Sequence, residues 1–341
     1  MSDTAPPARS ETDYLGLAAR YAAPLFLVAL IALFALLEPR FLHPLNIMNI
    51  LRQVSISGLV AVGMTFVILT AGIDLSVGSL VALTGLVAAY VAKGGLDDRF
   101  AVGASVDAGN PVIFAVLAAV AVGMICGAAQ GLAITRLRVP PFVVTLGGLT
   151  AFRGLALLLS GGGPISGFEM GYIWWGQGRV YGVPVPVIIF IGAAIVAHVV
   201  LTQSQFGRHV YAVGGNPDAA ERNSVPVRRV TLSVYIIVGF FCGLASFLLS
   251  ARLNSAEAVA GLQLELDVIA AVVIGGTSLF GGAGSIPGTI VGVLLIGVLR
   301  NGLVLLNVSS FVQQILIGLI LVLAVAIDQR AKGRLKTGLG N

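Results

Sequence analysis

The sequence predicts an all-α membrane protein with about ten transmembrane helices. Of its 341 residues, 57% are hydrophobic and only 10% are charged, whereas soluble domains carry roughly 25% charged residues. A soluble globule needs polar atoms to face water, so a chain of this composition suits a lipid environment. The second observation is the series of long apolar runs, which approach the roughly 20 residues that one span requires. The lipid bilayer is therefore the first predicted partner.

The apolar runs define the spans in order. The first follows a polar tail at 1–20 and ends at Glu38-Pro39-Arg40 without a small-residue cleavage site, so it is interpreted as a retained span. The eighth is short and rich in glycine. A transmembrane domain at 21–328 and a second tail at 329–341 follow from this pattern. The spans are predicted at 21–37, 54–70, 76–92, 112–135, 142–160, 183–201, 230–250, 268–280, 286–306 and 311–327.

Basic residues orient these spans. With the N-terminus inside, the inner segments hold twelve lysines and arginines and the outer segments hold seven. Cytoplasmic loops carry such an excess, so both termini are predicted to be cytoplasmic. The outer loop 161–182 contains Tyr172, Trp174 and Trp175, which suit the membrane–water interface; a ligand cage is the alternative.

The longest inner loop, 202–229, contains a predicted surface helix. Asn216 suits the N-cap, Pro217 suits the first helical position, and Asp218 and Glu221 lie where the helix dipole favours negative charge. The helix is expected to end before Pro226. A simple connection needs no helix, so this one is predicted to dock a partner; a solvated loop is the alternative. The docking residues are Gly214, Gly215, Asn216, Pro217, Asp218, Ala219, Ala220, Glu221 and Arg222.

Two glycine-rich segments, 69–79 and 274–285, interrupt the apolar pattern. Both combine glycines with small hydroxyl residues, and the order of the spans suggests an inverted repeat that relates spans two to five to spans seven to ten. Glycine permits a broken helix or a close approach between helices. We expect the breaks and one arginine to form the solute path, through Gly72, Asp74, Ser76, Gly78, Arg153, Gly275, Gly276 and Thr277.

Polar residues in the spans leave alternatives open. Asp74 either lines a cavity or caps the third span beside Ser76. Arg153 either pairs with a carboxylate, lines the cavity or extends toward water. Asp267, beside Glu265, is interpreted as a cap of the eighth span. A further set is expected to bridge helices, with contact to a polyol as the alternative: Asn301, Asn307, Gln313 and Gln314.

The sequence lacks the patterns of several other classes. It contains neither a phosphate-binding GxxxxGK[ST] motif nor a zinc-binding HExxH motif, so no catalytic residue, metal site or bound cofactor is predicted. Cys126 and Cys242 lie in apolar runs and are interpreted as buried thiols. Basic residues form no continuous stripe, so nucleic acid is not a predicted partner. A membrane-embedded enzyme is disfavoured. An ion-coupled transporter would need more ionisable residues at the midplane than Asp74 and Arg153.

Three motifs resemble the membrane permease of ribose-type sugar importers of the ATP-binding-cassette class. The first is AVGMT with GIDLSVGS, at 61–65 and 72–79. The second is AVGGNP at 212–217, followed by Ala219 and Ala220. The third is DVIAAVVIGGTSL at 267–279 and continues through 285, 301–303 and 308–310. The resemblance extends from about Pro39 to Asp328.

This resemblance implies a homodimer or pseudo-dimer of permeases in a bacterial inner membrane, with two separate ATPase subunits that consume ATP and a periplasmic solute-binding protein. It implies a pentose, hexose or related polyol as cargo; a branched-chain amino-acid or nucleoside permease is the alternative. The docking helix would receive the ATPase, and alternating access would follow. The chain departs from the family at Asn223-Ser224, where Ser-Gly or Ala-Gly is common, so this helix is expected to end differently.

Overall fold

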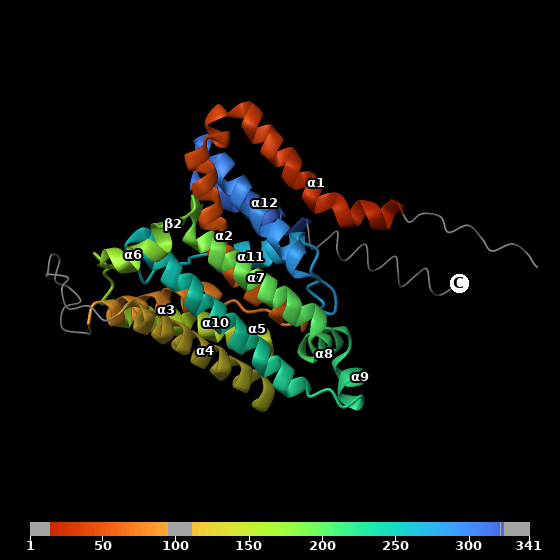
Figure 1. Cartoon of the computed structure of the whole chain (residues 1–341). Helices are drawn as coiled ribbons and strands as arrows, with labels where there is room; N and C mark the ends of the chain where they lie inside the picture. Colours follow the sequence, from red (N-terminus) through yellow and green to blue (C-terminus); the bar gives the residue numbers. More distant parts are fainter. Residues whose placement is uncertain (1–13, 95–110, 321, 324–341) are drawn as a thin grey trace, which may run out of the picture.

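The computed structural model describes residues 14–94, 111–320 and 322–323. The predicted tail 329–341, most of the tail 1–20 and most of the outer loop 93–110 lie outside these ranges. The described chain is a bundle of helices, and its only strands are two-residue segments (Figure 1). The all-α class is therefore confirmed.

Six helices of the described chain are long and apolar enough to cross a membrane. Three shorter apolar helices accompany them: Ala23–Leu37 within α1 (Tyr14–Leu37), α3 (Val77–Ala92) and Ser310–Ile320. Together they coincide with nine of the ten predicted spans. The six long helices are α2 (Pro44–Leu69), α4 (Val112–Arg136), α5 (Pro141–Ser160), α7 (Val185–Gln203), α10 (Val227–Leu253) and α12 (Ile286–Leu305).

The eighth predicted span is wrong as a full crossing. Its helix, α11 (Leu264–Ile274), has 11 residues. At about 1.5 Å per residue it is roughly 16 Å long, whereas the hydrocarbon core is about 30 Å thick. The remaining residues of the predicted span belong to an irregular segment, 275–285, that leads to α12.

Two helix starts also differ from the prediction. Helix α2 begins at Pro44, ten residues before the predicted span, because His43 caps it through Nδ1 (3.4 Å to the Leu45 N–H) and proline suits the first helical position. Its first turns carry Asn46, Arg52 and other polar residues, so a search for long apolar runs does not recognise these turns as part of a helix. Helix α1 begins at Tyr14, so the end of the predicted N-terminal tail is helical.

Short elements occupy the two ends of the bundle (Figure 1). At one end, strand β1 (Ile165–Ser166) pairs antiparallel with β4 (Ser255–Ala256), and β2 (Arg179–Val180) pairs with β3 (Val183–Pro184). Helix α6 (Met170–Gln177) lies beside them, and the turn η1 (Pro39–Leu42) joins α1 to α2. At the other end lie α8 (Gln205–Gly215) and α9 (Pro217–Arg222). We call these the α6 end and the α8–α9 end.

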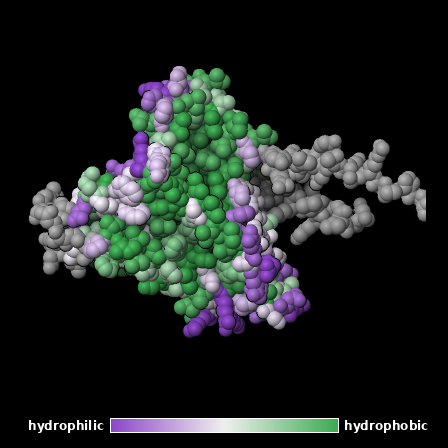
Figure 2. Space-filling view, in the orientation of Figure 1, coloured by the Kyte–Doolittle hydropathy of each residue, from purple (hydrophilic) through white to green (hydrophobic). Residues whose placement is uncertain are grey.

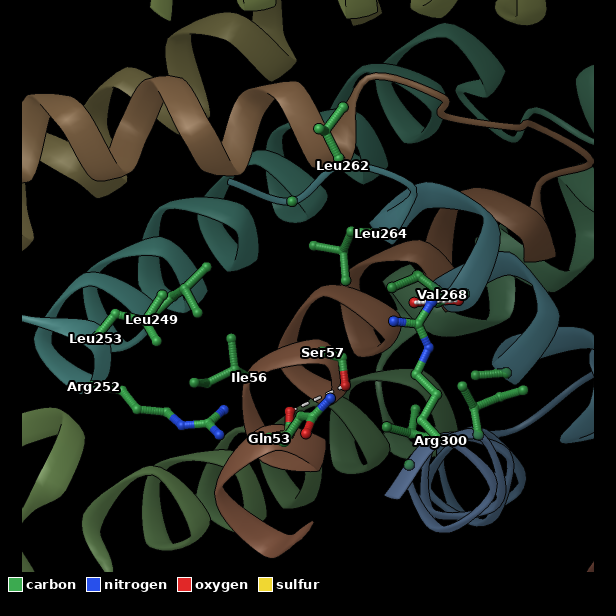
Figure 3. A pocket seen from close by; sticks show the side chains of 16 residues that line it. Gln53, Ile56, Ser57, Leu249, Arg252, Leu253, Leu262, Leu264, Val268 and Arg300 are labelled. Carbon is green, nitrogen blue, oxygen red and sulfur yellow. Dashed lines mark hydrogen bonds and ion pairs between the residues drawn. The ribbon is translucent and has the colours of Figure 1, made fainter. Parts of the chain in front are cut away.

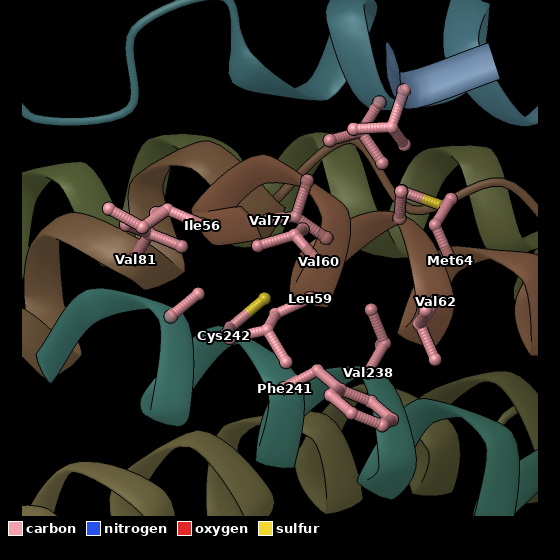
Figure 4. Close-up of a cluster of buried hydrophobic side chains, with 14 of the residues drawn as sticks. Ile56, Leu59, Val60, Val62, Met64, Val77, Val81, Val238, Phe241 and Cys242 are labelled. Carbon is pink, nitrogen blue, oxygen red and sulfur yellow. The ribbon is translucent and has the colours of Figure 1, made fainter. Parts of the chain in front are cut away.

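The core lies around α2 and α10, which pack against each other. Helix α2 also packs on α11 and α12, whereas α10 packs on α3 and α4. If α2 to α5 form one half of the bundle and α10 to α12 belong to the other, each of the two central helices packs on helices of the half to which it does not belong. These contacts join spans two to five to spans seven to ten, the two groups that the sequence relates as an inverted repeat. Figure 4 shows one shared layer, in which Leu59 and Val60 of α2 lie near Val77 of α3 and Val238 and Cys242 of α10.

Glycine permits the closest of these contacts. A Cβ atom on Gly123 of α4 would collide with the carbonyl of Gly239 in α10, and one on Gly239 would collide with that of Gly123. Gly127 and Gly131 extend the small-residue face of α4 along α10, at the spacing typical of closely packed transmembrane helices.

The outer surface of the bundle is apolar. Leu36, Leu158 and Phe311 are each more than three-quarters exposed. Figure 2 shows hydrophobic residues over most of the visible face, with hydrophilic residues gathered toward the two ends. A water-soluble protein rarely exposes so large an apolar area, whereas lipid-facing helices require one.

Candidate translocation and coupling site

Helix α2 ends in a Schellman motif at the first glycine-rich break. The Gly72 N–H donates to the Val67 carbonyl (3.0 Å), and the Ala71 N–H donates to the Ile68 carbonyl (2.9 Å). Ala71 takes φ of 59°, a left-handed conformation that costs a residue with a side chain roughly 1–2 kcal/mol. The break is therefore a defined helix end.

Helix α11 ends in the same motif at the second break. The Thr277 N–H donates to the Val272 carbonyl (3.1 Å), and the Gly276 N–H donates to the Val273 carbonyl (2.9 Å). Here the left-handed position holds a glycine, with φ of 91°. The likeness of the two segments in sequence thus reflects a shared way of ending a helix.

Close glycine contacts join α11 to α12 beyond this break. A Cβ atom on Gly275 would meet the carbonyl of Gly288, and one on Gly288 would meet the carbonyl of Gly275. Gly292 of α12 lies equally close to the Ala271 carbonyl. The two helices therefore touch through their backbones.

The two breaks meet each other and the end of α8. The Gly282 N–H donates to the Leu69 carbonyl at the end of α2 (2.9 Å). Gly214, in the last turn of α8, lies directly against this bond: a Cβ atom there would collide with the Leu69 carbonyl and approach the Gly282 nitrogen to 2.6 Å. The Tyr211 hydroxyl donates to the Gly284 carbonyl (2.9 Å). We call residues 69–71, 211–215 and 281–284 the junction.

The predicted docking residues divide into two helices. The helix expected at 214–222 is interrupted at Asn216, which has extended backbone angles and caps α9 by accepting from the Ala219 N–H (3.0 Å). Gly214 and Gly215 belong to α8, which the sequence analysis did not predict; Ser204, whose Oγ accepts from the Gly207 N–H (3.0 Å), is its start signal.

The residues of α9 differ in their exposure to solvent. Ala220 is buried in the protein, at 5% exposure, and so is not available to a partner. The face that remains open to a partner consists of Pro217, Asp218, Ala219, Glu221 and Arg222.

Helix α9 also ends in a Schellman motif, before Pro226 as predicted. The Val225 N–H donates to the Ala220 carbonyl (3.0 Å), and the Ser224 N–H donates to the Glu221 carbonyl (3.0 Å). Ser224 holds the left-handed position, with φ of 63°. The glycine common in the resembling family would fit this position without strain, so the departure in sequence places a strained serine at this turn.

Asp74 forms hydrogen bonds inside the first glycine-rich break. It is fully buried, and its Oδ1 accepts from the Ser76 N–H (2.8 Å) and hydroxyl (2.6 Å). Ser76 has helical backbone angles directly before α3, so the Asp74 carboxylate accepts an N–H at the start of that helix, as the capping interpretation predicts. Gln130 of α4 donates to the Ser76 hydroxyl (2.8 Å), and Thr145 of α5 donates to the Ile73 carbonyl (3.1 Å). The first break is thus anchored to α4 and α5.

Gly78 and Arg153 both hold the loop between α10 and α11, residues 254–263. A Cβ atom on Gly78 would collide with the Gly261 carbonyl and the Glu265 carboxylate. Arg153 donates to the Ala258 carbonyl and to the Ala260 carbonyl (3.0 Å), so these hydrogen bonds go to backbone oxygens of the loop. Both residues therefore position this loop.

A cavity of about 330 Å³ lies between α2, α10, α11 and α12 (Figure 3). None of the eight residues predicted for the solute path lines it. Asp267 does, and it forms an ion pair with Arg300 of α12 (2.7 Å), whereas the N-cap of α11 is Gln263. The capping interpretation of Asp267 is therefore wrong. The polar lining residues are Gln53, Ser57, Arg252, Asp267 and Arg300.

Two other predictions from polar and aromatic residues have mixed outcomes. Asn301 of α12 and Asn46 of α2 exchange hydrogen bonds (2.9 Å each), so helix bridging is confirmed there. Tyr172 is buried and bonds Ser250 (2.6 Å), so its place is in the core, whereas Trp174 is 45% exposed.

These features define the class of the protein, an all-α, multi-pass membrane protein with helices broken by glycine-rich segments. Residues 46–325 match the family model described as branched-chain amino acid transport system / permease component, and the chain belongs to this family. No solved structure was found to match it.

Curated relatives are similar over most of their length. The ribose import permease protein of Bacillus subtilis is 44% identical over 89% of this chain and 91% of its own. The D-allose transport system permease protein of Escherichia coli is 37% identical over 91% of each chain. The xylose transport system permease protein of Haemophilus influenzae is 36% identical over 86% of this chain and 92% of its own.

Proposed function

We propose that the chain is the permease subunit of an ATP-driven importer for a monosaccharide or related polyol. The observation that carries this proposal is the similarity, at 36–44% identity over nearly the whole chain, to permeases named for ribose, allose and xylose. The broader family description names branched-chain amino acids. The named relatives favour sugars, and leucine serves as the test of the other cargo class.

The proposed importer contains further subunits. A multi-pass inner-membrane permease without a nucleotide-binding motif needs a separate ATPase, which binds and consumes the ATP. A periplasmic binding protein delivers the cargo, and a second permease copy completes the pore. The twelve-to-seven distribution of basic residues supports cytoplasmic termini, with α8 and α9 on the cytoplasmic side.

The exposed face of α9 is the proposed contact with the ATPase. Three observations support it: α9 lies at the end of the bundle, its exposed face carries the charged residues Asp218, Glu221 and Arg222, and α8 leads directly into the junction. A displacement of α8 moves Gly214 and Tyr211, which contact both breaks. The first break is anchored to α4 and α5 and the second to α12, so such a displacement changes how the two halves meet.

The test is reconstitution of the permease with its ATPase and binding protein. Glu221→Lys and Ala219→Trp alter the exposed face of α9, and Glu38→Lys is the control, because Glu38 lies in the turn between α1 and α2. We expect the first two variants to insert normally but to lose ATP hydrolysis stimulated by loaded binding protein, whereas the control retains it. Full stimulation in both α9 variants would place the ATPase contact elsewhere.

A further inference from the structure

The cavity between α2, α10, α11 and α12 combines an apolar wall with converging polar groups. Leu249, Leu264 and Val268 supply part of the apolar wall. Figure 3 shows Gln53 and Ser57 on α2, lying between Arg252 and Arg300. Sites for small molecules have this composition and volumes of roughly 300–1,000 Å³, and this cavity measures about 330 Å³.

The ion pair in this cavity is not needed to hold its two helices together. Asp267 is 12% exposed and Arg300 is 30% exposed, so both charges lose much of their hydration. Burying such a pair costs free energy that an apolar pair would not require. Helices α11 and α12 already touch through Gly275 and Gly288. The packing of α11 on α12 therefore does not explain why this ion pair is present, and we looked for a role of the pair in the cavity.

The cavity still offers unused hydrogen-bonding capacity. The Nε of Arg300 is buried without a partner, and within the described residues the Arg252 guanidinium has no hydrogen bond or ion pair. Gln53 supplies an amide donor and acceptor, and Asp267 supplies carboxylate oxygens. A neutral polyhydroxyl compound has hydroxyl groups that both donate and accept, and its C–H faces suit the apolar wall.

We propose that this cavity is a transient binding site for a neutral polyhydroxyl solute, with Asp267 and Arg300 as its hydrogen-bonding wall. The inference rests on the proposed function and assigns the solute contact to residues outside the glycine-rich breaks. The loop 254–263 borders the cavity through Gly261 and Leu262. Arg153 and Gly78, which hold this loop, then act as positioning residues for the site.

The first test removes the charges together. Asp267→Asn with Arg300→Gln keeps similar side-chain sizes and leaves neither charge buried alone. Loss of one or two hydrogen bonds of about 1 kcal/mol each predicts a fall of about five-fold or more in sugar transported per ATP hydrolysed. Stimulated ATP hydrolysis should stay within about two-fold, because Asn301, next to Arg300, bonds Asn46 at the start of α2, at the α6 end of the bundle.

The matched control is the pair Glu38 and Arg40, joined at 2.8 Å. Hydrogen bonds from the Arg40 side chain and backbone lower the pKa of Glu38 to about 2, so this pair is also charged at neutral pH. Glu38→Gln with Arg40→Gln should leave the transport ratio unchanged. An unchanged ratio in the Asp267 and Arg300 double variant would overturn the inference.

The second test detects the solute directly. Ser57→Cys, in a complete importer lacking Cys126 and Cys242, places a reactive thiol in the cavity, and Tyr181→Cys is a fully exposed control at the α6 end. Millimolar D-ribose, D-xylose or D-allose should slow thiol labelling at position 57 and leave position 181 unaffected. Leucine should slow neither.

The outcomes separate the two proposals. Sugar uptake by the wild-type importer without protection of position 57 by any transported sugar would overturn this inference alone, as would protection by leucine. A wild-type importer that transports none of the three sugars would overturn the proposed function, and the inference with it.

Discussion

Gly214 gives the sharpest test of the junction, because its neighbour Gly215 provides a matched control. Both residues lie in the last turn of α8, but a Cβ atom on Gly214 would meet backbone atoms of both breaks, whereas one on Gly215 has nothing within 4 Å. Alanine at 214 would overlap the Leu69 carbonyl oxygen and approach the Gly282 nitrogen to 2.6 Å; the second contact alone needs a separation of about 0.8 Å to reach an ordinary 3.4 Å, and the first needs more.

The energetic consequence follows from that displacement. Forcing one extra carbon into a packed site costs roughly 1–3 kcal/mol, and the hydrogen bond from the Gly282 N–H to the Leu69 carbonyl lies within the displaced contact. Both alanine variants gain about 1 kcal/mol of helix propensity over glycine, so this effect cancels between them. We therefore expect Gly214→Ala to be less stable than Gly215→Ala by about 1–3 kcal/mol.

The assay measures thermal stability, sugar uptake and stimulated ATP hydrolysis in the reconstituted importer. Gly214→Ala should lower the melting temperature and lower uptake more than it lowers ATP hydrolysis. Gly215→Ala should resemble the wild type in all three measurements. Equal behaviour of the two variants would refute the reasoning that α8 acts on the breaks through this contact.

Three further predictions concern the α8–α9 end and the orientation of the chain. Ala220→Trp should destabilise the isolated permease by about 1–3 kcal/mol because Ala220 is buried, whereas Ala219→Trp should spare stability and weaken only ATPase assembly; thermal unfolding with and without the ATPase separates them. Ser224→Gly should raise the unfolding free energy by roughly 1 kcal/mol by relieving the left-handed serine, and an unchanged melting temperature would count against that strain. An impermeant thiol reagent should label Tyr181→Cys in intact cells and spare Asp218→Cys; the reverse pattern would invert the proposed orientation.

The apolar spans were largely predictable because lipid-facing helices must be long and apolar. The prediction failed where a helix is short or begins among polar residues. Helix α11 has 11 residues and is continued in sequence by glycines that look apolar, and α2 begins with turns that carry Asn46 and Arg52. Pro44, which suits the first helical position, was present in the sequence and marks the true start.

The site was less predictable, because its contacts join segments distant in sequence. The cavity brings Gln53 together with Arg252 and Arg300, and no local spacing relates these positions. Asp267 resembles a cap because it lies in the first turn of α11, and only its partner on α12 shows the ion pair. The glycine-rich breaks were easier to recognise in the sequence. Left-handed helix ends and close backbone contacts both favour glycine, so the breaks appear as clusters of glycine.

The most direct test of the central claim is ATP-dependent solute uptake by proteoliposomes that contain the permease, its ATPase and its binding protein. The account predicts uptake of at least one of radiolabelled ribose, xylose or allose that requires hydrolysable ATP and exceeds uptake of leucine. Uptake of leucine alone, or sugar uptake that proceeds on an ion gradient without ATP hydrolysis, would contradict it.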